Sequence, residues 1–474
     1  MLSQRTRVVA VVFLGLTIFL ASFGVAWANG ADPAGGDTLT EDPNAAVNFA
    51  WTLMAGFLVF IMQAGFAFLG AGLIRAKNTV NYMTKSFMDF MIASLSFWAF
   101  GFAIMFGGSA LASGLSQGNP LVGFSGFFLT GDAYDVSTIM NWVFQMMFAA
   151  TACTIVAGCV AERTRVQAYL AYSFILGAII YPVYGHWVWG GGWLATLPFG
   201  AGAKDFAGSG VVHVVGGLVG LAGAAVVGPR IGKFNLDGTP NAIPGHNMVY
   251  VVIGTFILFF GWFGFNAGST LAATDLRIAV IAANTLLAGA TGAVVAIYYT
   301  LARTGKADVA MACNGALGGL VGITAPAAYV APWAAVAIGA VAALVVIGSL
   351  SLVERVLKID DPVGAVSVHA GAGLWGLLAV GIFADGTYGG VSGLVAGETG
   401  QLLAQLISMG AVTTWALGAG LLLFWALKKT MGLRASREEE LGGLDLPEHG
   451  AVAYDTATNG SHTGSRPGVR QASV

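Results

Sequence analysis

Residues 205–221 read DFAGSGVVHVVGGLVGL, and residues 361–377 repeat this pattern as DPVGAVSVHAGAGLWGL. In the ten-residue segments that begin one residue before His213 and His369, six positions are identical. An aspartate stands eight residues before each histidine. The chain therefore contains an internal repeat, and the placement of its two copies decides the fold that we predict.

The composition is typical of a protein embedded in a lipid bilayer. Hydrophobic residues make up 57% of the chain, charged residues 9%, and the mean hydropathy is +0.78. Many apolar runs reach the ~20 residues that cross a hydrocarbon core of ~30 Å. The net charge of −2 excludes little, because the side of the membrane on which a charge lies matters more than the total. We predict a polytopic membrane protein surrounded by lipid, with no nucleic-acid partner.

The first residues resemble a secretory signal peptide. Arg5 and Arg7 precede an apolar core, and residues 26–28 (AWA) place small side chains where a signal peptidase cleaves. An uncleaved first helix is the alternative, and it gives the same outward start. The predicted segments are a signal peptide at 1–28, a transmembrane domain at 29–428 and a cytoplasmic regulatory tail at 429–474.

Eleven apolar runs follow the signal peptide. Alternate loops and the tail hold seventeen of the 21 Lys and Arg residues, whereas only Lys204 and Arg277 fall on the other side. The positive-inside rule therefore predicts a start outside the cell and a tail in the cytoplasm. The runs lie at 47–74, 84–112, 138–161, 167–189, 207–228, 247–266, 277–302, 308–327, 331–354, 363–384 and 402–427.

The repeated histidines fall in the fifth and tenth runs. Because five is odd, the second copy enters the membrane in the opposite sense, which predicts a 5+5 inverted repeat with one helix appended. The 69 glycines recur inside the runs, and small residues let helices approach closely in lipid. We predict an all-α bundle in which His213 and His369 meet near the membrane midplane.

Ionisable side chains within membrane spans are costly to bury and indicate function. A hydrogen-bonded structural role is the alternative for either histidine, but two of them in a repeated context favour a pore lining. Two imidazoles are too few for a metal site, and the three cysteines lack ligand spacing. We also find no nucleophile paired with a base. We therefore expect no metal, no cofactor and no enzymatic activity.

Several motifs together resemble the ammonium transporter family, the Amt branch of the Amt/Rhesus superfamily. They are DFAGSGVVH, VWGGGWLA, GWFGFNAGST, KIDDPVGAVSVH and the tail GLRASREEELGGLDLPEHGAVAY, and they occur in family order over nearly the whole mature chain. The resemblance implies a homotrimer of eleven-helix protomers in the cell (inner) membrane. Each protomer would have its own pore for ammonium or ammonia, with methylammonium as an analogue. A Rhesus-like conductor of ammonia or carbon dioxide and an ammonium sensor of the same fold are the alternatives.

The resemblance also implies residue roles. Phe144, Trp189 and Ser269 match an outer vestibule, where aromatic faces and a hydroxyl can hold an ammonium ion while water leaves. A tryptophan of the membrane interface is the alternative for Trp189. Phe148 and Phe265 match two phenylalanines that close the pore and oppose a hydrated cation.

Below this gate, His213 and His369 would line the pore, since a neutral imidazole can both donate and accept a hydrogen bond. We expect ammonium to lose its proton and ammonia to pass, with and without separate passage of the proton as the two alternatives. Asp205 precedes the fifth run, so helix capping is the first role that we expect for it. Acceptance of the proton from ammonium is the alternative role.

The chain departs from the family pattern at three places. Some members carry aspartate where this chain has Gly364, glycine is frequent where it has Ala370, and the segment 189–205 is longer than in shorter bacterial forms. The tail mixes charges, helix-forming glutamates and a Gly-Gly break, so we predict a docked segment. Its resemblance to the family tail implies packing against the inner loops, with a PII-type nitrogen-signalling protein as a candidate partner. We predict that residues 457–474 are disordered.

Overall fold

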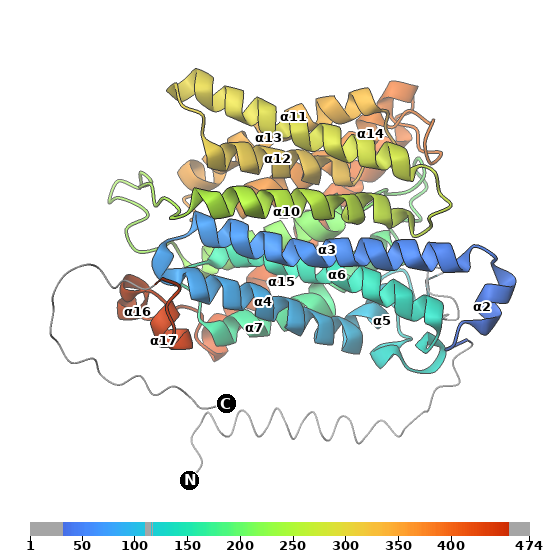
Figure 1. The fold of residues 1–474 in the computed structure, drawn as a ribbon, viewed down its shortest axis with the longest axis horizontal. Helices are drawn as coiled ribbons and strands as arrows, with labels where there is room; N and C mark the ends of the chain where they lie inside the picture. The colour runs from blue at the N-terminus through green and yellow to red at the C-terminus, as the bar shows by residue number, and fades with distance from the viewer. Residues whose placement is uncertain (1–31, 110–114, 116, 455–474) are drawn as a thin grey trace, which may run out of the picture.

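Long helices packed side by side build the molecule (Figure 1). The computed structural model describes residues 32–109, 115 and 117–454. The predicted signal peptide at 1–28 and the predicted disordered end at 457–474 lie outside the described residues. Within the described part, ten helices are long and apolar enough to cross a membrane, and an eleventh apolar helix, α12 (Val309–Thr324), is shorter.

The helices are joined by connections of very different length, and several helices continue through a π-helical turn. The α-helices are α2 (Gly36–Glu41), α3 (Ala45–Leu73), α4 (Thr79–Ser96), α5 (Phe102–Phe106), α6 (Val136–Val160), α7 (Val166–Ile175), α8 (Tyr181–Val188), α9 (Val215–Val227), α10 (Met248–Ala267), α11 (Ile278–Thr304), α12, α13 (Pro332–Ser351), α14 (Ala372–Phe383), α15 (Gly400–Thr430), α16 (Arg437–Gly442) and α17 (Asp445–His449). The π-helical turns are η2 (Phe97–Gly101), η5 (Leu176–Ile180), η6 (Ser209–Val214), η8 (Leu352–Val356) and η9 (Val366–Gly371). Short 3-10 turns are η1 (Ala76–Asn78), η3 (Phe127–Leu129), η4 (Gly131–Ala133), η7 (Gly268–Thr270) and η10 (Leu394–Ala396).

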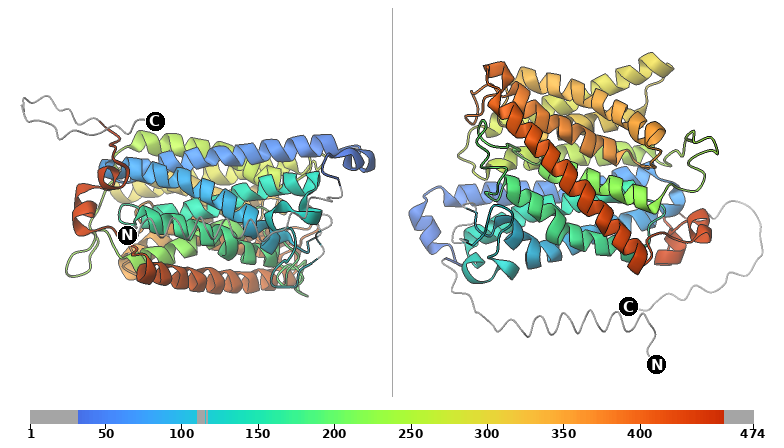
Figure 2. Two further views of the ribbon diagram at one scale, coloured as in Figure 1. Left: turned by 90° about the horizontal axis from the view of Figure 1, so that it is seen from below. Right: turned by 180° about the vertical axis from the view of Figure 1, so that it is seen from behind.

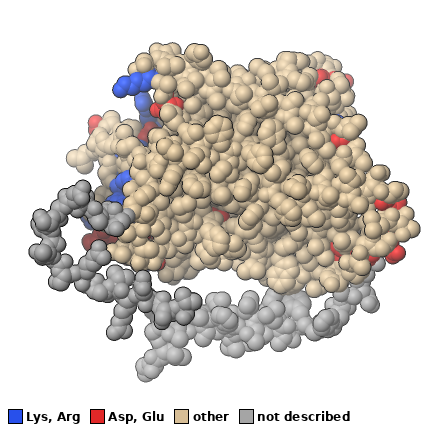
Figure 3. All heavy atoms as spheres, viewed as in Figure 1, with Lys and Arg blue, Asp and Glu red and all other residues tan. Residues whose placement is uncertain are grey.

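Charged side chains are concentrated at the two ends of the bundle. A broad band with few charges separates the ends, and the Lys and Arg residues visible in Figure 3 lie at the end that carries α16 and α17. We call this the tail end. Large apolar side chains such as Phe256 (72% exposed) and Leu422 (66% exposed) face outward from the band. This surface suits lipid and would be unfavourable in water.

Glycines bring the helix backbones together, as the composition predicted. A Cβ added to Gly254 of α10 would lie 2.4 Å from the backbone nitrogen of Leu69 in α3, and one added to Gly292 of α11 would lie 2.2 Å from the carbonyl oxygen of Gly315 in α12. Only a residue without a side chain fits such contacts. On the far face, α15 crosses the bundle obliquely (Figure 2) and packs Gly420 against Val219 of α9.

The predicted boundary of the second run is wrong. We expected the run at 84–112, but the helical segment covers Ala76–Phe106. The cause is Lys85, which is buried inside α4 instead of marking its end. Its Nζ donates to the carbonyl oxygen of Thr164 at 2.5 Å and pairs with Glu448 at 3.2 Å. Charged partners from the tail allow this lysine to lie within a helix.

The tail docks against the bundle, which confirms the prediction for the described residues up to 454. Glu440 accepts from the backbone N–H of Ile231 at 2.7 Å, and Asp445 accepts from the backbone N–H of Asn81 at 2.8 Å. Ser436 caps α16 in a capping box. The tail thus bridges the start of α4 and the loop after α9.

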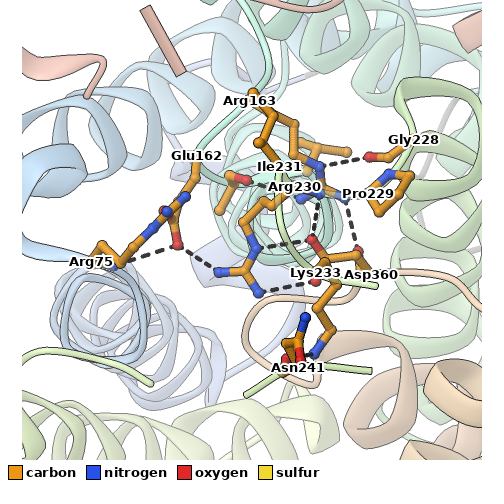
Figure 4. A network of polar contacts seen from close by, with 12 residues as sticks. Arg75, Glu162, Arg163, Gly228, Pro229, Arg230, Ile231, Lys233, Asn241 and Asp360 are labelled. Carbon is orange, nitrogen blue, oxygen red and sulfur yellow. Dashed lines mark hydrogen bonds and ion pairs between the residues drawn. The ribbon is translucent and has the colours of Figure 1, made fainter. Parts of the chain in front are cut away.

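A buried ionic network connects loops at the tail end of the bundle (Figure 4). Glu162 is 2.5 Å from Arg75 and 2.6 Å from Arg230, measured between the bonded O and N atoms. Arg230 also binds Asp360 through two N–H donors at 2.9 Å each. Burial raises the pKa of Asp360, but the hydrogen bond from Arg230 and the charge of Arg163 outweigh it and hold this pKa at about 2. Loops from four parts of the chain are therefore fixed together at the tail end.

Candidate functional site

The repeated histidines lie in matching structural contexts. His213 is in η6 and His369 is in η9, so each copy of the repeat begins with a π-helical turn that contains its histidine. π-Helical turns are rare and occur frequently at functional sites. Both side chains are buried, at 0% and 4% exposure. The structure therefore brings together the two residues that the repeat singled out.

The two imidazoles contact each other directly. Their Nδ1 atoms are 3.2 Å apart, and the ring planes are inclined by 22°. One Nδ1 must carry the shared hydrogen, and in neutral rings the tautomers then follow. The ring that donates has a bare Nε2, and the ring that accepts has a protonated Nε2. The pair therefore presents one acceptor and one donor to a small polar molecule.

Close contacts between the two helices are reciprocal, as an inverted repeat requires. Gly217, four residues after His213, would place a Cβ 2.5 Å from the backbone nitrogen of Ala370. Gly373, four residues after His369, would place one 2.8 Å from the side chain of Val214. In each copy, the residue after one histidine thus faces the glycine one turn beyond the other. Ala370, a departure from the family pattern, fits this contact with its small side chain.

A column of aromatic rings leads to the histidine pair. The rings of Phe144 and Phe148 are 4.8 Å apart, and those of Phe148 and Phe265 are 4.2 Å apart. Phe265 lies 5.4 Å from His213 in a stacked arrangement. All three phenylalanines are at most 1% exposed. The candidate gate residues and the candidate pore histidines form one continuous column.

Trp189 stands at the edge of this column. Its ring lies 6.2 Å from that of Phe148, nearly perpendicular to it, and its Nε1–H donates to the carbonyl oxygen of Asp205 at 2.6 Å. Ser269 donates its hydroxyl hydrogen to the carbonyl oxygen of Phe265 at 2.8 Å, which leaves lone pairs on the hydroxyl oxygen. Gly268, beside Ser269, would place a Cβ 3.2 Å from the ring of Phe144. The candidate vestibule residues thus lie close together at the Phe144 end of the column.

Asp205 caps the first repeat helix. Its two carboxylate oxygens accept from four successive backbone N–H groups, those of residues 208–211, at 2.8–2.9 Å. Burial raises the pKa of Asp205 to about 6, although these four hydrogen bonds lower it. The side chain is 4% exposed. Capping, the first role expected from the sequence, matches this geometry.

Two cavities lie on the other side of the histidines, toward the tail end. A cavity of about 20 Å³ is bordered by His369, Phe66 and Thr154, and it is large enough for one water-sized molecule. A wider cavity of about 510 Å³ contains Arg230 and Asp361 in its wall. Asn314 and Val363 line both cavities. The column is therefore closed by aromatic rings at one end, and two cavities follow the histidines at the other end.

Sequence reasoning missed two aromatic residues at the site. Trp262 stacks on His213 with ring centres 5.2 Å apart and donates its Nε1–H to Thr324 at 2.9 Å. Phe66 lies 5.9 Å from the ring of His369. Trp262 precedes Phe265 by three residues, so helical spacing could have placed both on one face. Phe66 had no comparable signal. Among the described residues, no three His, Cys, Asp or Glu side chains gather as a metal site.

Comparisons with known proteins agree with this geometry. The profile of the Ammonium Transporter Family matches residues 50–454. The chain is 54% identical over 438 residues to "Ammonium transporter Amt2" of Archaeoglobus fulgidus, covering 90% of this chain and 92% of that protein. It is 40% identical to "Ammonium transporter 1 member 1" of Arabidopsis thaliana, covering 81% of each.

Solved structures give the same result. A structure described as "Sensor Amt Protein" superposes with a TM-score of 0.78 at 38% identity and covers 86% of this chain and 100% of that one. The crystal structure of Mep2 from Candida albicans superposes with a TM-score of 0.74 at 30% identity and covers 84% and 87%. On sequence and structure together, the chain belongs to the ammonium transporter family.

Proposed function

We propose that the protein selects ammonium at the vestibule around Trp189, removes its proton and conducts ammonia past His213 and His369. The observation that carries this proposal is the unbroken column from Phe144 to His369, built only from uncharged rings. An ion would lose its hydration there at a large free-energy cost, whereas neutral ammonia loses little and regains hydrogen bonds at the histidine pair. Passage of the proton by a separate route would add a net current, and electroneutral passage of ammonia alone would not.

Selection of ammonium would occur at the Phe144 end of the column, which Trp189 and Ser269 also border. Aromatic faces attract a cation by ~1–2 kcal/mol when it is desolvated, and the lone pairs of Ser269 can accept an N–H. Potassium has a similar charge but no hydrogen to donate. This difference supports discrimination in favour of ammonium.

Asp205 acts chiefly as a helix cap in this proposal, with proton acceptance as the alternative role. All four hydrogen bonds to its carboxylate come from the backbone, which favours capping. Asp205→Asn preserves much of the shape while removing the charge. Full retention of transport in this variant would exclude proton acceptance, and complete loss with intact folding would support it.

We further propose that the tail end faces the cytoplasm, that α12 crosses the membrane as the eleventh helix, and that three protomers assemble in the cell inner membrane. The concentration of Lys and Arg at the tail end supports this orientation (Figure 3). The chain would start outside after a cleaved signal peptide. The docked tail offers a surface for a PII-type regulatory protein.

A sensor role is the second candidate, because one structure that the chain resembles is a sensor Amt protein. Such a role would require ammonium binding without substantial flux. A Rhesus-like conductor of ammonia or carbon dioxide is disfavoured by Trp189 and by the docked tail.

Charge movement in proteoliposomes on a solid-supported membrane tests the proposal. An ammonium pulse should give a saturable current, with none for potassium, and His213→Ala with His369→Ala should abolish it or remove its selectivity. Phe265→Ala should weaken discrimination, whereas Phe256→Ala, on the lipid-facing side of the same helix, should not. Electroneutral ammonia passage would appear as a rise in internal pH without current. If ammonium gave neither a current nor a change in internal pH, the sensor role would be favoured.

A further inference from the structure

An acidic side chain lies buried between membrane helices, beside the aromatic column. Asp89 of α4 is 0% exposed. In the described part of the chain, no Lys, Arg or His nitrogen lies within 4 Å of its carboxyl group. Lys85, one turn earlier, bonds to Thr164 and Glu448 instead. A carboxylate without a counter-ion is very costly at such a place, so the neutral acid is the favoured state.

Hydroxyl groups from two other helices contact Asp89. The Tyr169 hydroxyl of α7 donates to Oδ2, and Oγ1 of Thr154 in α6 lies 2.7 Å from Oδ1. The titratable groups around Asp89 are Tyr82 and Lys85 on α4, Cys153 on α6, and Tyr169 and Tyr172 on α7. Lys85 is the one cation among them, and it is directed toward the tail.

The hydrogens around Thr154 can be counted. Its Oγ1 is 2.7 Å from Oδ1 of Asp89 and also 2.7 Å from Oε1 of Gln63, but a hydroxyl has one hydrogen. A neutral Asp89 resolves this conflict, because it donates to Thr154 while Thr154 donates to Gln63. Turning the Gln63 amide would also supply a donor. That arrangement leaves an ionised Asp89 with two hydroxyl donors and no cation, which the buried position disfavours.

Thr154 connects this group to the proposed pore. It lines the cavity of about 20 Å³ that lies against His369. The other polar side chains in that lining are Tyr82 and Asn314. The cavity has room for one molecule of about the size of water. A molecule that leaves the histidine pair toward the tail end would therefore meet Thr154 next.

Resting on the proposed passage of ammonia, we propose that Thr154 is a further ammonia-binding residue of the pore and that Asp89, as a neutral acid, is the positioning residue that orients its hydroxyl. The oxygen of Thr154 has two lone pairs. One accepts from Asp89, and in this proposal the other accepts an N–H of ammonia or of a small neutral amine. The carbonyl oxygen of Ala150, 3.1 Å from Oγ1, can compete with Gln63 only for the hydroxyl hydrogen. Asp89 thus prepares an acceptor without placing a charge in the pore.

Substitution of Thr154 tests the binding role. Thr154→Val keeps the shape but removes the hydroxyl, so we expect the maximal ammonium current to fall about 10-fold. The half-saturating concentration should stay within 2-fold, because the distant vestibule sets it. Thr154→Ser should retain the current. The matched control is Thr151→Val, one turn earlier on α6, where the hydroxyl bonds only to the carbonyl oxygen of Met147. A normal maximal current in Thr154→Val would overturn the proposal.

Substitution of Asp89 tests the positioning role. Asp89→Leu should lower the maximal current as Thr154→Val does. Asp89→Asn should restore it, because an amide N–H can donate to Thr154 while the amide oxygen accepts from Tyr169, as the neutral acid does. If asparagine fails as leucine does while the protein stays folded, a neutral acid is not what the site requires.

Infrared spectroscopy reports on Asp89 independently of transport. Wild-type protein at neutral pH should show the carbonyl stretch of a protonated carboxylic acid, and Asp89→Asn should lack that band. Its absence from the wild type would overturn the proposal. If the wild type moves neither charge nor internal pH, the proposed function fails and the ammonia-binding role of Thr154 fails with it. The infrared band still decides the state of Asp89 in that case.

Discussion

The two copies of the repeat have the same motif but end in different surroundings. Asp205 and Asp361 both stand eight residues before a histidine of the buried pair, and both are followed three residues later by a glycine of positive φ. Asp205 accepts from four backbone N–H groups, and its own carbonyl oxygen accepts from Trp189. Asp361 accepts at 2.7 Å from the backbone N–H of Val366, its Oδ1 is buried without a hydrogen-bond partner among the described residues, and it borders the 510 Å³ cavity.

This difference shows that a repeat in the sequence does not give its two copies the same surroundings. The helix pair and its histidines are related by the inverted repeat, but the residues that cover the two ends are not. Phe148 and Phe265 close the end near Asp205, whereas no matching pair of rings borders Asp361 among the residues lining its cavity. Selection at one end and open release at the other can follow from this asymmetry.

Separate alanine substitutions of Asp205 and Asp361 should give the largest difference in the free energy of unfolding. Asp205→Ala leaves four buried N–H groups unsatisfied, and each costs ~1–3 kcal/mol. We expect the free energy of unfolding to drop by at least ~4 kcal/mol, with loss of ammonium current. Asp361→Ala should cost only ~1–3 kcal/mol, because one backbone bond is lost. Heat stability of the purified protein, measured by the remaining monodisperse fraction, checks both. Equal effects would break the comparison.

Alanine substitution of the glycine three residues after each aspartate should likewise destabilise the protein more in the first copy of the repeat than in the second. Gly208 has φ of 113°, and an added Cβ would lie 2.7 Å from a methyl group of Val212. Gly364 has φ of 78°, and its added Cβ would lie 3.1 Å from Asn314. Gly364→Ala should cost ~1–2 kcal/mol from backbone strain. Gly208→Ala should cost more because a steric clash is added. The same heat-stability measurement orders the two variants, and a milder Gly208→Ala would contradict the structure.

The glycines at the helix crossing should instead behave alike. Gly217→Ala and Gly373→Ala each insert a methyl group into a reciprocal contact, so each should destabilise by ~1–3 kcal/mol. Both should also disturb the histidine pair and lower the current. Gly410→Ala on α15 is the control, since its added Cβ meets nothing within 4 Å. A large effect of one crossing variant without the other would show that the repeat is not symmetric at its centre.

The last effect that we predict is on pH dependence. Burial raises the pKa of Asp205 and of Asp361 to about 6, above the ordinary value of 3.8. The unfolded chain therefore releases these protons at lower pH than the folded one, so stability should fall as pH rises from about 4 to about 6 and then level off. The difference between the two pKa values corresponds to at most ~3 kcal/mol for each group. Asp205→Asn and Asp361→Asn should each flatten the pH profile of heat stability, and an opposite slope would refute the assignment.

Much of the site could be predicted, partly from the repeat and partly from the family resemblance. The resemblance singled out Phe148, Phe265 and Trp189, and the repeat singled out both histidines; the structure places all five together. Trp262 was missed although it lies three residues before Phe265, because neither the repeat nor the resemblance gave it a role. Lys85 misled the prediction of a helix boundary, because its partner Glu448 is 363 residues away in the chain.

The sequence by itself determined a membrane protein of apolar helices, an inverted repeat and a histidine pair, because hydrophobic length, charge position and motif spacing are local properties of a chain. Only the tertiary structure decided which surroundings each copy of the repeat received. The stacking of Trp262 on His213, the cavity beside Asp361 and the contact of Asp89 with Thr154 depend on how separate helices pack. Such contacts join residues that are distant in sequence, and spacing along the chain carries no record of them.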